Sequence, residues 1–148
     1  IHISQWLINS QPFTFVYFHP EYPHYGCLVL NAENDPYEMK NMPLRSGEII
    51  MGDMNIDYLS TTSHPNRNYL QTFCAKNNLQ IADIGPTHND ITWIDHILYD
   101  PKCKPFHTFT YRNLYSDHRA LAVRFIANIT PLNVNEVYNM DVDTDVED

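Results

Sequence analysis

A chain of 148 residues has the length of a single domain, and a complete domain of that size buries roughly 70% of the surface that its unfolded chain exposes. Hydrophobic residues make up 43% of the sequence and charged residues 18%, a balance that excludes a wholly disordered protein. The formal net charge of -9 at pH 7 argues against a nucleic-acid partner until the charges are located along the chain.

The acidic excess is concentrated in one segment. Residues 131–148 contain six acidic residues and no Lys or Arg, which leaves 12 acidic against 9 basic residues before them, a net charge of -3. Apolar periodicity also stops after Pro131, so we expect a partial domain at residues 1–130 and an acidic, disordered tail at residues 131–148. The near-neutral first region argues only weakly against DNA as a partner.

The cysteines and the hydropathy of the chain indicate its redox compartment and whether it crosses a membrane. Cys27, Cys74 and Cys103 are odd in number and include no C-x-x-C pair, which argues against a disulfide framework or a zinc knuckle and indicates a reducing compartment. No apolar run approaches the roughly 18 residues that span a bilayer, so no membrane partner is expected. The localisation is otherwise open: intracellular, and nuclear if the protein acts on DNA.

Runs of β-branched and aromatic residues predict strands, and amphipathic spacing predicts helices. In chain order the predicted elements are a strand at 13–18, a helix at 27–33, a strand at 48–51, a helix at 66–77, and strands at 79–84, 91–99, 106–111 and 120–126. Pro20 and Pro23 stop the first strand, and Gly85-Pro86 forms a turn. The pattern indicates an α/β fold whose second half is dominated by strands.

Polar clusters lie at or beside the ends of these predicted strands. They are Gly52-Asp53-Met54-Asn55, Trp93-Ile94-Asp95-His96 and Ser116-Asp117-His118. Residues two apart on an extended segment point to the same side, so Asp53 and Asn55 can face one pocket, and Gly52 allows close backbone approach. A carboxylate such as Asp95 can accept the ring N–H of His118 and fix its tautomer. The clusters therefore predict a poised imidazole beside a carboxylate and an amide.

Asp53, Asn55 and Asp117 offer hard oxygen ligands, which suit Mg²⁺ or Mn²⁺ better than zinc. Phosphoester hydrolysis is the natural reaction, because a metal neutralises the phosphate, an acid or base activates water, and a protonated imidazole stabilises developing charge. Each cluster alone also has a structural explanation: Asp and Asn after Gly are common turn formers, and Ser116-Asp117-His118 can cap an element. Only the three clusters together point to a function.

In this order, G-D-x-N at 52–55, I-D-H at 94–96 and S-D-H at 116–118 resemble the endonuclease/exonuclease/phosphatase family, over about residues 13–126. The surrounding sequence is similar to its non-long-terminal-repeat retrotransposon branch, which is apurinic-endonuclease-like: G-D-M-N-I-D-Y-L, Y-L-Q-T-F-C-A-K-N-N-L, P-T-H, I-D-H-I-L and S-D-H-R-A-L-A-V. The resemblance implies a two-sheet sandwich flanked by helices and a Mg²⁺- or Mn²⁺-dependent endonuclease that hydrolyses a phosphodiester bond in DNA.

The resemblance also implies a role for each residue of the clusters. Asp53 and Asn55 would activate the attacking water and hold the phosphate. Asp117 would join Asp53 and Asn55 as a metal ligand. Asp95 would orient His118, and His118 would contact the scissile phosphate.

One tyrosine, one tryptophan and four histidines outside the proposed catalytic set are also candidates for the site. F-V-Y-F-H-P at 15–20 is similar to the family strand whose Tyr touches the substrate phosphate, so that role is assigned to Tyr17. Trp93 is expected near the rim of the site, without a catalytic role. His96 follows Asp95 and alternates to the other face of its strand, so we expect it to be packed or exposed. His19, His88 and His107 show no metal-ligand spacing and receive no role.

The chain departs from the family pattern before Tyr17. The family uses an upstream Asn and a metal-binding Glu on separate strands, and none of the 16 residues before Tyr17 matches either motif. The chain, which begins at Ile1 without a Met, therefore resembles an N-terminally truncated domain, with weakly held metal and uncovered apolar surface near its start. An N-terminal half or a reverse transcriptase in a longer parent chain would be the expected partner.

Three functions stay open on the sequence alone. The first is a Mg²⁺-dependent DNA endonuclease. The second is a catalytically inactive, retroelement-derived remnant or interaction module, which the absent Glu favours. The third is a phosphatase of the same family acting on lipid or inositol phosphates, and the nuclease-like sequence after Asp53 counts against it.

Overall fold

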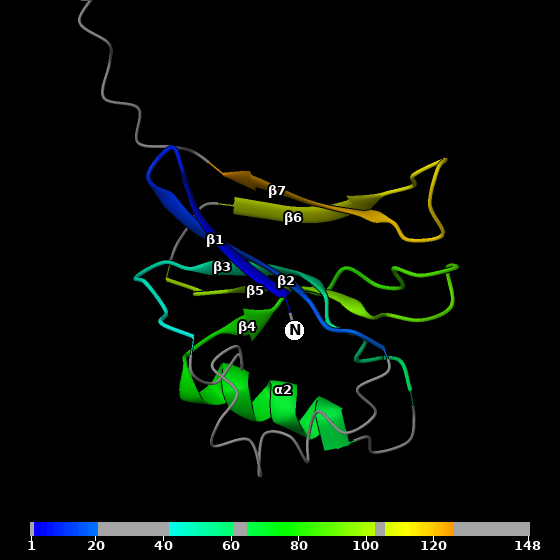
Figure 1. Ribbon diagram of the computed structural model, residues 1–148, viewed down its shortest axis with the longest axis horizontal. Coiled ribbons are helices and arrows are strands. Elements are labelled where there is room, and N and C mark those ends of the chain that lie inside the picture. Colours follow the sequence, from blue (N-terminus) through cyan, green and yellow to red (C-terminus); the bar gives the residue numbers. More distant parts are fainter. Residues whose placement is uncertain (1, 21–41, 61–64, 103–105, 126–148) are drawn as a thin grey trace, which may run out of the picture.

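The computed structural model describes residues 2–20, 42–60, 65–102 and 106–125. Within them, strands form two sheets and one helix lies against the larger sheet (Figure 1). The elements are β1 (His2–Ile8), β2 (Gln11–Tyr17), β3 (Ile49–Asp53), α2 (Pro65–Lys76), β4 (Gln80–Ile81), β5 (Asp95–Tyr99), β6 (Phe106–Tyr111) and β7 (Ala120–Phe125). The predicted α/β class is confirmed at this level; the predicted helix at 27–33 and the tail at 131–148 lie outside the described residues.

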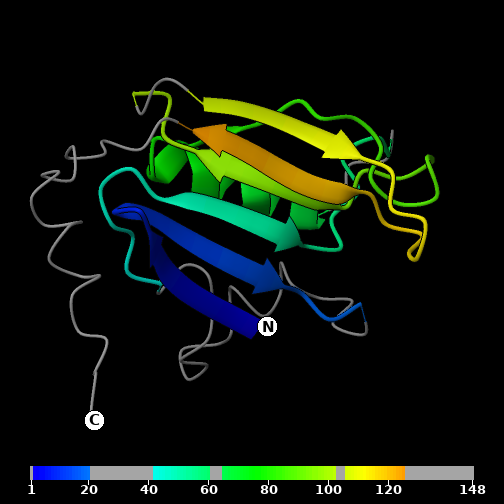
Figure 2. The ribbon, with the colours of Figure 1, turned by 90° about the horizontal axis from the view of Figure 1, so that it is seen from above.

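The larger sheet has the strand order β1-β2-β3-β5-β4. β2 runs parallel to β3, whereas the β1–β2, β3–β5 and β4–β5 pairs are antiparallel. β6 and β7 form a separate antiparallel pair over one face of this sheet, and α2 covers the opposite face (Figures 1 and 2). The described part of the fold is therefore layered as small sheet, large sheet and helix.

Alternation along β3 divides the core between the two faces of the large sheet. Ile50 packs on the helix side with Leu70 and Phe73 of α2, while Ile49 and Met51 point the other way. On that side they meet apolar side chains of β7, namely Leu121, Val123 and Phe125. Asp53 continues the row of Ile49 and Met51, so the alternation places its carboxylate at the end of the gap between the sheets.

Two predicted strands are shorter in the structure than in the sequence-based assignment. The strand predicted at 79–84 is confined to Gln80–Ile81, and the strand predicted at 91–99 begins only at Asp95. Asn89 and Asp90 have φ of 50° and 55°, and the Ile91 N–H donates to the His88 carbonyl at 3.0 Å. Two successive positive φ angles define a tight hairpin turn. This turn lies just before the predicted strand, Thr92 then pairs back on His88 through an isolated bridge, and the chain joins the sheet only at Asp95.

Residues 2–8 form a strand that was not predicted, so the predicted strand at 13–18 corresponds to the second strand, β2. A two-residue turn at Asn9 and Ser10, with φ of 49° and 64°, joins β1 to β2. Asn-Ser between two strand-forming runs is a hairpin signal that the sequence does contain. Trp6 and Leu7 are 58% and 66% exposed, so apolar surface near the start of the chain is uncovered.

Cys74 of α2 is a buried free thiol, and burial raises its pKa to about 12. It therefore acts as a packing residue that stays protonated at neutral pH. Cys27 and Cys103 lie outside the described residues. No helix in the described ranges is long and apolar enough to cross a membrane.

Candidate active site

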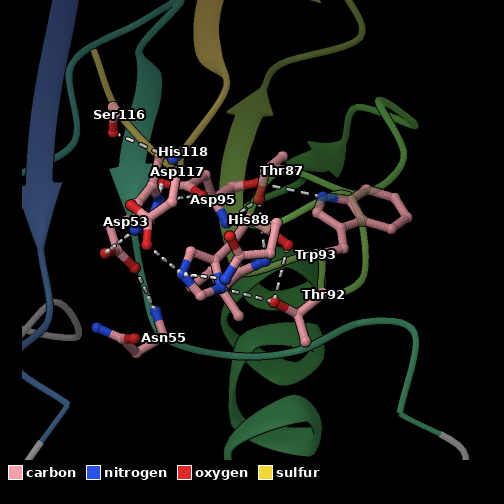
Figure 3. A network of polar contacts seen from close by, with 12 residues as sticks. Asp53, Asn55, Thr87, His88, Thr92, Trp93, Asp95, Ser116, Asp117 and His118 are labelled. Carbon is pink, nitrogen blue, oxygen red and sulfur yellow. Dashed lines mark hydrogen bonds and ion pairs between the residues drawn. The ribbon is translucent and has the colours of Figure 1, made fainter. Parts of the chain in front are cut away.

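Three strand ends bring the polar clusters together at one end of the gap between the two sheets (Figure 3). Asp53 is the last residue of β3, and Asp95, the first residue of β5, is its direct partner in register. Register partners point to the same face of a sheet, so both carboxylates face the small sheet. His118 approaches them from the segment that leads into β7.

Asp95 and His118 make the contact that the sequence predicted. Nδ1 of His118 lies 2.9 Å and 3.2 Å from the two carboxylate oxygens of Asp95, and Nε2 lies 4.0 Å from Oδ2 of Asp53. A proton on Nδ1 donated to Asp95 directs Nε2 towards the open site. Burial opposes protonation of His118, but the hydrogen bond and charge of Asp95 outweigh it and raise the His118 pKa above its ordinary value.

Asp53 and Asn55 form one polar corner of the site. The Asn55 backbone N–H donates to Oδ1 of Asp53 at 2.9 Å, and the Asn55 side-chain amide donates to the Phe18 carbonyl. The second bond engages Nδ2 of Asn55, so Oδ1 is the side-chain atom left to accept a hydrogen bond or bind a cation. Burial raises the Asp53 pKa, and the nearby charge of Asp95 adds to this effect. A cation would reverse both penalties, since it stabilises the ionised carboxylate.

Gly52 allows β2 to approach this corner. A Cβ at Gly52 would lie 2.0 Å from the Val16 carbonyl oxygen, and the φ of Gly52 is 146°. The Phe18 N–H then donates to the Asp53 carbonyl at 2.8 Å. The glycine of the first cluster is therefore required by backbone packing that fixes the position of Asp53.

Thr87 positions Asp95, a role that the sequence did not reveal. Its buried hydroxyl accepts hydrogen bonds from the backbone N–H groups of Ile94 at 3.2 Å and Asp95 at 3.0 Å. One side chain thus holds the start of β5. The P-T-H sequence at 86–88 was the available signal, but sequence spacing alone does not place Thr87 beside Asp95.

His88 is a second residue whose place in the site was missed. Its Nε2 lies 3.0 Å from Oδ2 of Asp117, and its ring centroid is 4.7 Å from that of His118. This bond lowers the Asp117 pKa. Ligand atoms of His88, Asp117 and His118 lie within 4.8 Å of one another, and so do those of Asp53, Asp95 and His118. Within the described part of the chain, the predicted metal ligands Asp53 and Asp117 do not share such a group with His118.

Tyr17 lies on the same face of the large sheet as Asp53 and is partly exposed, whereas His96 is buried. Tyr17 is the register partner of Asp53 across β2 and β3, which places it on the same face, and its ring stacks against His2 at 6.1 Å. His96 is fully buried, and its Nε2 lies 2.7 Å from the Ile56 carbonyl. Burial lowers the His96 pKa. The expectation that His96 is packed is confirmed, and Tyr17 is placed at the border of the site.

A pocket of about 300 Å³ adjoins the imidazole of His118. It is lined by Asn89, Asp90, Arg112, Asn113, Ser116, Asp117, His118 and Arg119. Arg112 and Arg119 both bind Asp90, at 2.7 Å and 2.9 Å. This shared pairing offsets part of their charge, so the pocket is polar without being strongly basic.

The chain matches no protein-family model, and a search of the curated proteins returns no match. The residues of the site and their geometry therefore carry the functional inference. They combine a buried carboxylate, Asp95, with a partly buried one, Asp53, an oriented imidazole and an amide oxygen near a polar pocket.

Proposed function

We propose that the protein is a metal-dependent phosphodiesterase of the retrotransposon-type DNA endonuclease class, with an endonuclease/exonuclease/phosphatase fold. The observation that supports this most is the Asp95–His118 pair, which directs Nε2 of His118 towards the carboxylate of Asp53. Asp53 ends β3, Asp95 begins β5 and His118 lies just before β7, so the three side chains come from separate parts of the chain.

The donor set fits a hard divalent cation. Asp53 and Asn55 would hold Mg²⁺ or Mn²⁺ through oxygen, and a cation there would stabilise the ionised form of Asp53, whose pKa burial raises. When bound, the cation would neutralise charge on the phosphate. Asp117 could join only by leaving its partner His88.

Each side chain has a separate role in the proposed reaction. His118 carries its proton over a wider pH range because of Asp95, and Nε2 donates to a phosphate oxygen as negative charge develops. Asp53 accepts a hydrogen bond from the attacking water and aligns it. Asn55, held through its amide by Phe18, contributes Oδ1 to the same water or cation. Tyr17 lies on the same face and would contact the substrate phosphate.

One observation favours the alternative of an inactive remnant. Glu48 is the only glutamate among the described residues, and its carboxylate is bound at 2.8 Å by Arg45 and also by Thr14. It precedes β3, at the opposite end of the strand from Asp53. No described glutamate therefore takes the place of the family's metal-binding Glu.

Nicking of supercoiled plasmid separates these possibilities. The purified chain is assayed with Mg²⁺ and with EDTA, beside Asp53→Asn and His118→Ala. Matched controls are Asp83→Asn and His107→Ala, which change exposed residues outside the site.

Mg²⁺-dependent nicking that is lost in both site variants and kept in both controls would support the endonuclease. Absence of nicking by a folded chain would refute the activity and favour the remnant. Hydrolysis of a phosphomonoester such as inositol phosphate, without nicking, would instead indicate the phosphatase.

A further inference from the structure

We propose that His88, Asp117 and His118 form a second cation site, one that prefers Zn²⁺ to Mg²⁺. The inference concerns binding by these three side chains and does not depend on the proposed nuclease activity. Their ligand atoms lie within 4.8 Å of one another, and they come from two segments that lie side by side through an antiparallel bridge between His88 and His118 (Figure 3).

Both imidazole rings have one nitrogen already occupied. Nδ1 of His118 is held by Asp95 at 2.9 Å, and Nδ1 of His88 lies 3.2 Å from the Thr92 hydroxyl. That hydroxyl is placed to donate its own proton to the His88 carbonyl at 3.5 Å, so it accepts from Nδ1–H of His88. Nε2 is therefore the atom of each ring left to bind a cation, and on His88 the cation would replace the Nε2 proton that is shared with Asp117. Metal-binding histidines show this arrangement, with the second ring nitrogen held by a protein oxygen.

The three ligand atoms lie within 4.8 Å of one another and would have to draw closer to bind one cation. Zinc bonds of about 2.0–2.1 Å in a tetrahedral site place neighbouring ligand atoms roughly 3.3 Å apart. Nε2 of His88 and Oδ2 of Asp117 are already 3.0 Å apart. The Asp117 side chain is 59% exposed, so it is free to adjust, while Thr92 and Asp95 fix the two rings.

The donor set selects the cation. Two imidazole nitrogens and one carboxylate suit zinc, whereas Mg²⁺ prefers octahedral oxygen coordination and retains its waters. The Asp53–Asn55 corner has the opposite, all-oxygen character. With three protein ligands and partial exposure, the second site leaves a position open to water. The guanidinium of Arg119, the residue after His118, is paired with Asp90 at 2.9 Å.

Zinc binding is measured on the metal-free full chain, without DNA, by competition with a chromophoric chelator in millimolar Mg²⁺. We expect the unmodified chain to bind one Zn²⁺. His88→Gln should bind Zn²⁺ at least tenfold more weakly. Thr92→Val removes only the oxygen behind His88 and should weaken binding about 10- to 100-fold, as loss of such partners does. His107→Gln, an exposed histidine near the other end of the small sheet, is the matched control and should bind as the unmodified chain does.

Thermal melting of every variant shows whether it is folded. If His88→Gln does not fold, Thr92→Val provides the test of the site. Unchanged zinc affinity in a folded His88→Gln or Thr92→Val chain would overturn the site. Displacement of Zn²⁺ by millimolar Mg²⁺ would overturn its selectivity. Because no nucleic acid is present, a chain that binds zinc but does not nick DNA refutes only the nuclease, and the reverse result refutes only this site.

Discussion

Replacing Thr87 with valine tests how the site is supported. Valine keeps the shape of the side chain and removes the hydroxyl that accepts from the N–H groups of Ile94 and Asp95. The Asp95 N–H is buried, so loss of its acceptor costs about 1–3 kcal/mol. The Ile94 N–H is only partly buried and water can replace some of its bond, which makes a total of about 2–4 kcal/mol reasonable. That is a large share of a typical domain stability of about 5–15 kcal/mol.

Urea denaturation followed by tryptophan fluorescence measures this loss. Thr87→Ser is the matched control, because it keeps the hydroxyl and removes only a methyl group, at a cost of about 1 kcal/mol. Thr87→Val should also let Asp95 shift, so that the His118 pKa falls towards its ordinary value in an NMR titration. If Thr87→Val is as stable as Thr87→Ser and leaves the His118 titration unchanged, Thr87 does not hold Asp95 and the reasoning is wrong.

Further expectations concern the charge pairs and the core. Asp95→Asn should lower the His118 pKa in an NMR titration and reduce nicking by about 10²- to 10⁴-fold, the usual contribution of a positioned acid or base; unchanged nicking would remove Asp95 from the mechanism. Leu70→Ala, at a fully buried position of α2, should cost about 2–5 kcal/mol in urea denaturation. Burial opposes ionisation of Glu48, but the hydrogen bonds from Arg45 and Thr14 lower its pKa below 4.5. The contribution of ionised Glu48 to the free energy of unfolding is therefore full above pH 4.5 and is lost as the pH falls through the folded-state pKa. Arg45→Gln should make the free energy of unfolding, measured by urea denaturation between pH 3 and 7, depend less on acid pH.

The sequence was most informative where one pattern determined the local structure. Apolar runs located β3, β6 and β7, and amphipathic spacing located α2 to within a residue at each end. Because strand ends meet at a sheet edge, the polar clusters after and before these runs could be expected to converge. The contact between Asp95 and His118 follows from that logic, although their catalytic roles stay predictions.

The remainder depended on interactions that no local pattern encodes. Thr87 and His88 lie in a loop, and they reach the site only because a tight turn at Asn89 and Asp90 folds that loop beside β5. Asp117 has the composition of a metal ligand, yet its bond to His88 depends on how two loops face each other. Such side-chain pairings are set by tertiary packing, which composition and periodicity do not specify.

The division of the site between two sheets has a consequence for its durability. Asp53 and Asp95 belong to the large sheet, which has its own core against α2, whereas His118 lies in the segment that leads into β7 of the small sheet. The β6–β7 pair is held to the rest of the fold by an apolar cluster, by the bridge between His88 and His118 and by the pairs of Asp90 with Arg112 and Arg119, and its opening would break these contacts while the core against α2 stays folded. Opening would separate the imidazole from both carboxylates at a free energy below that of global unfolding. The site would then be lost on heating before the fold, and amide hydrogens of β6 and β7 would exchange earlier than those of β3 and β5.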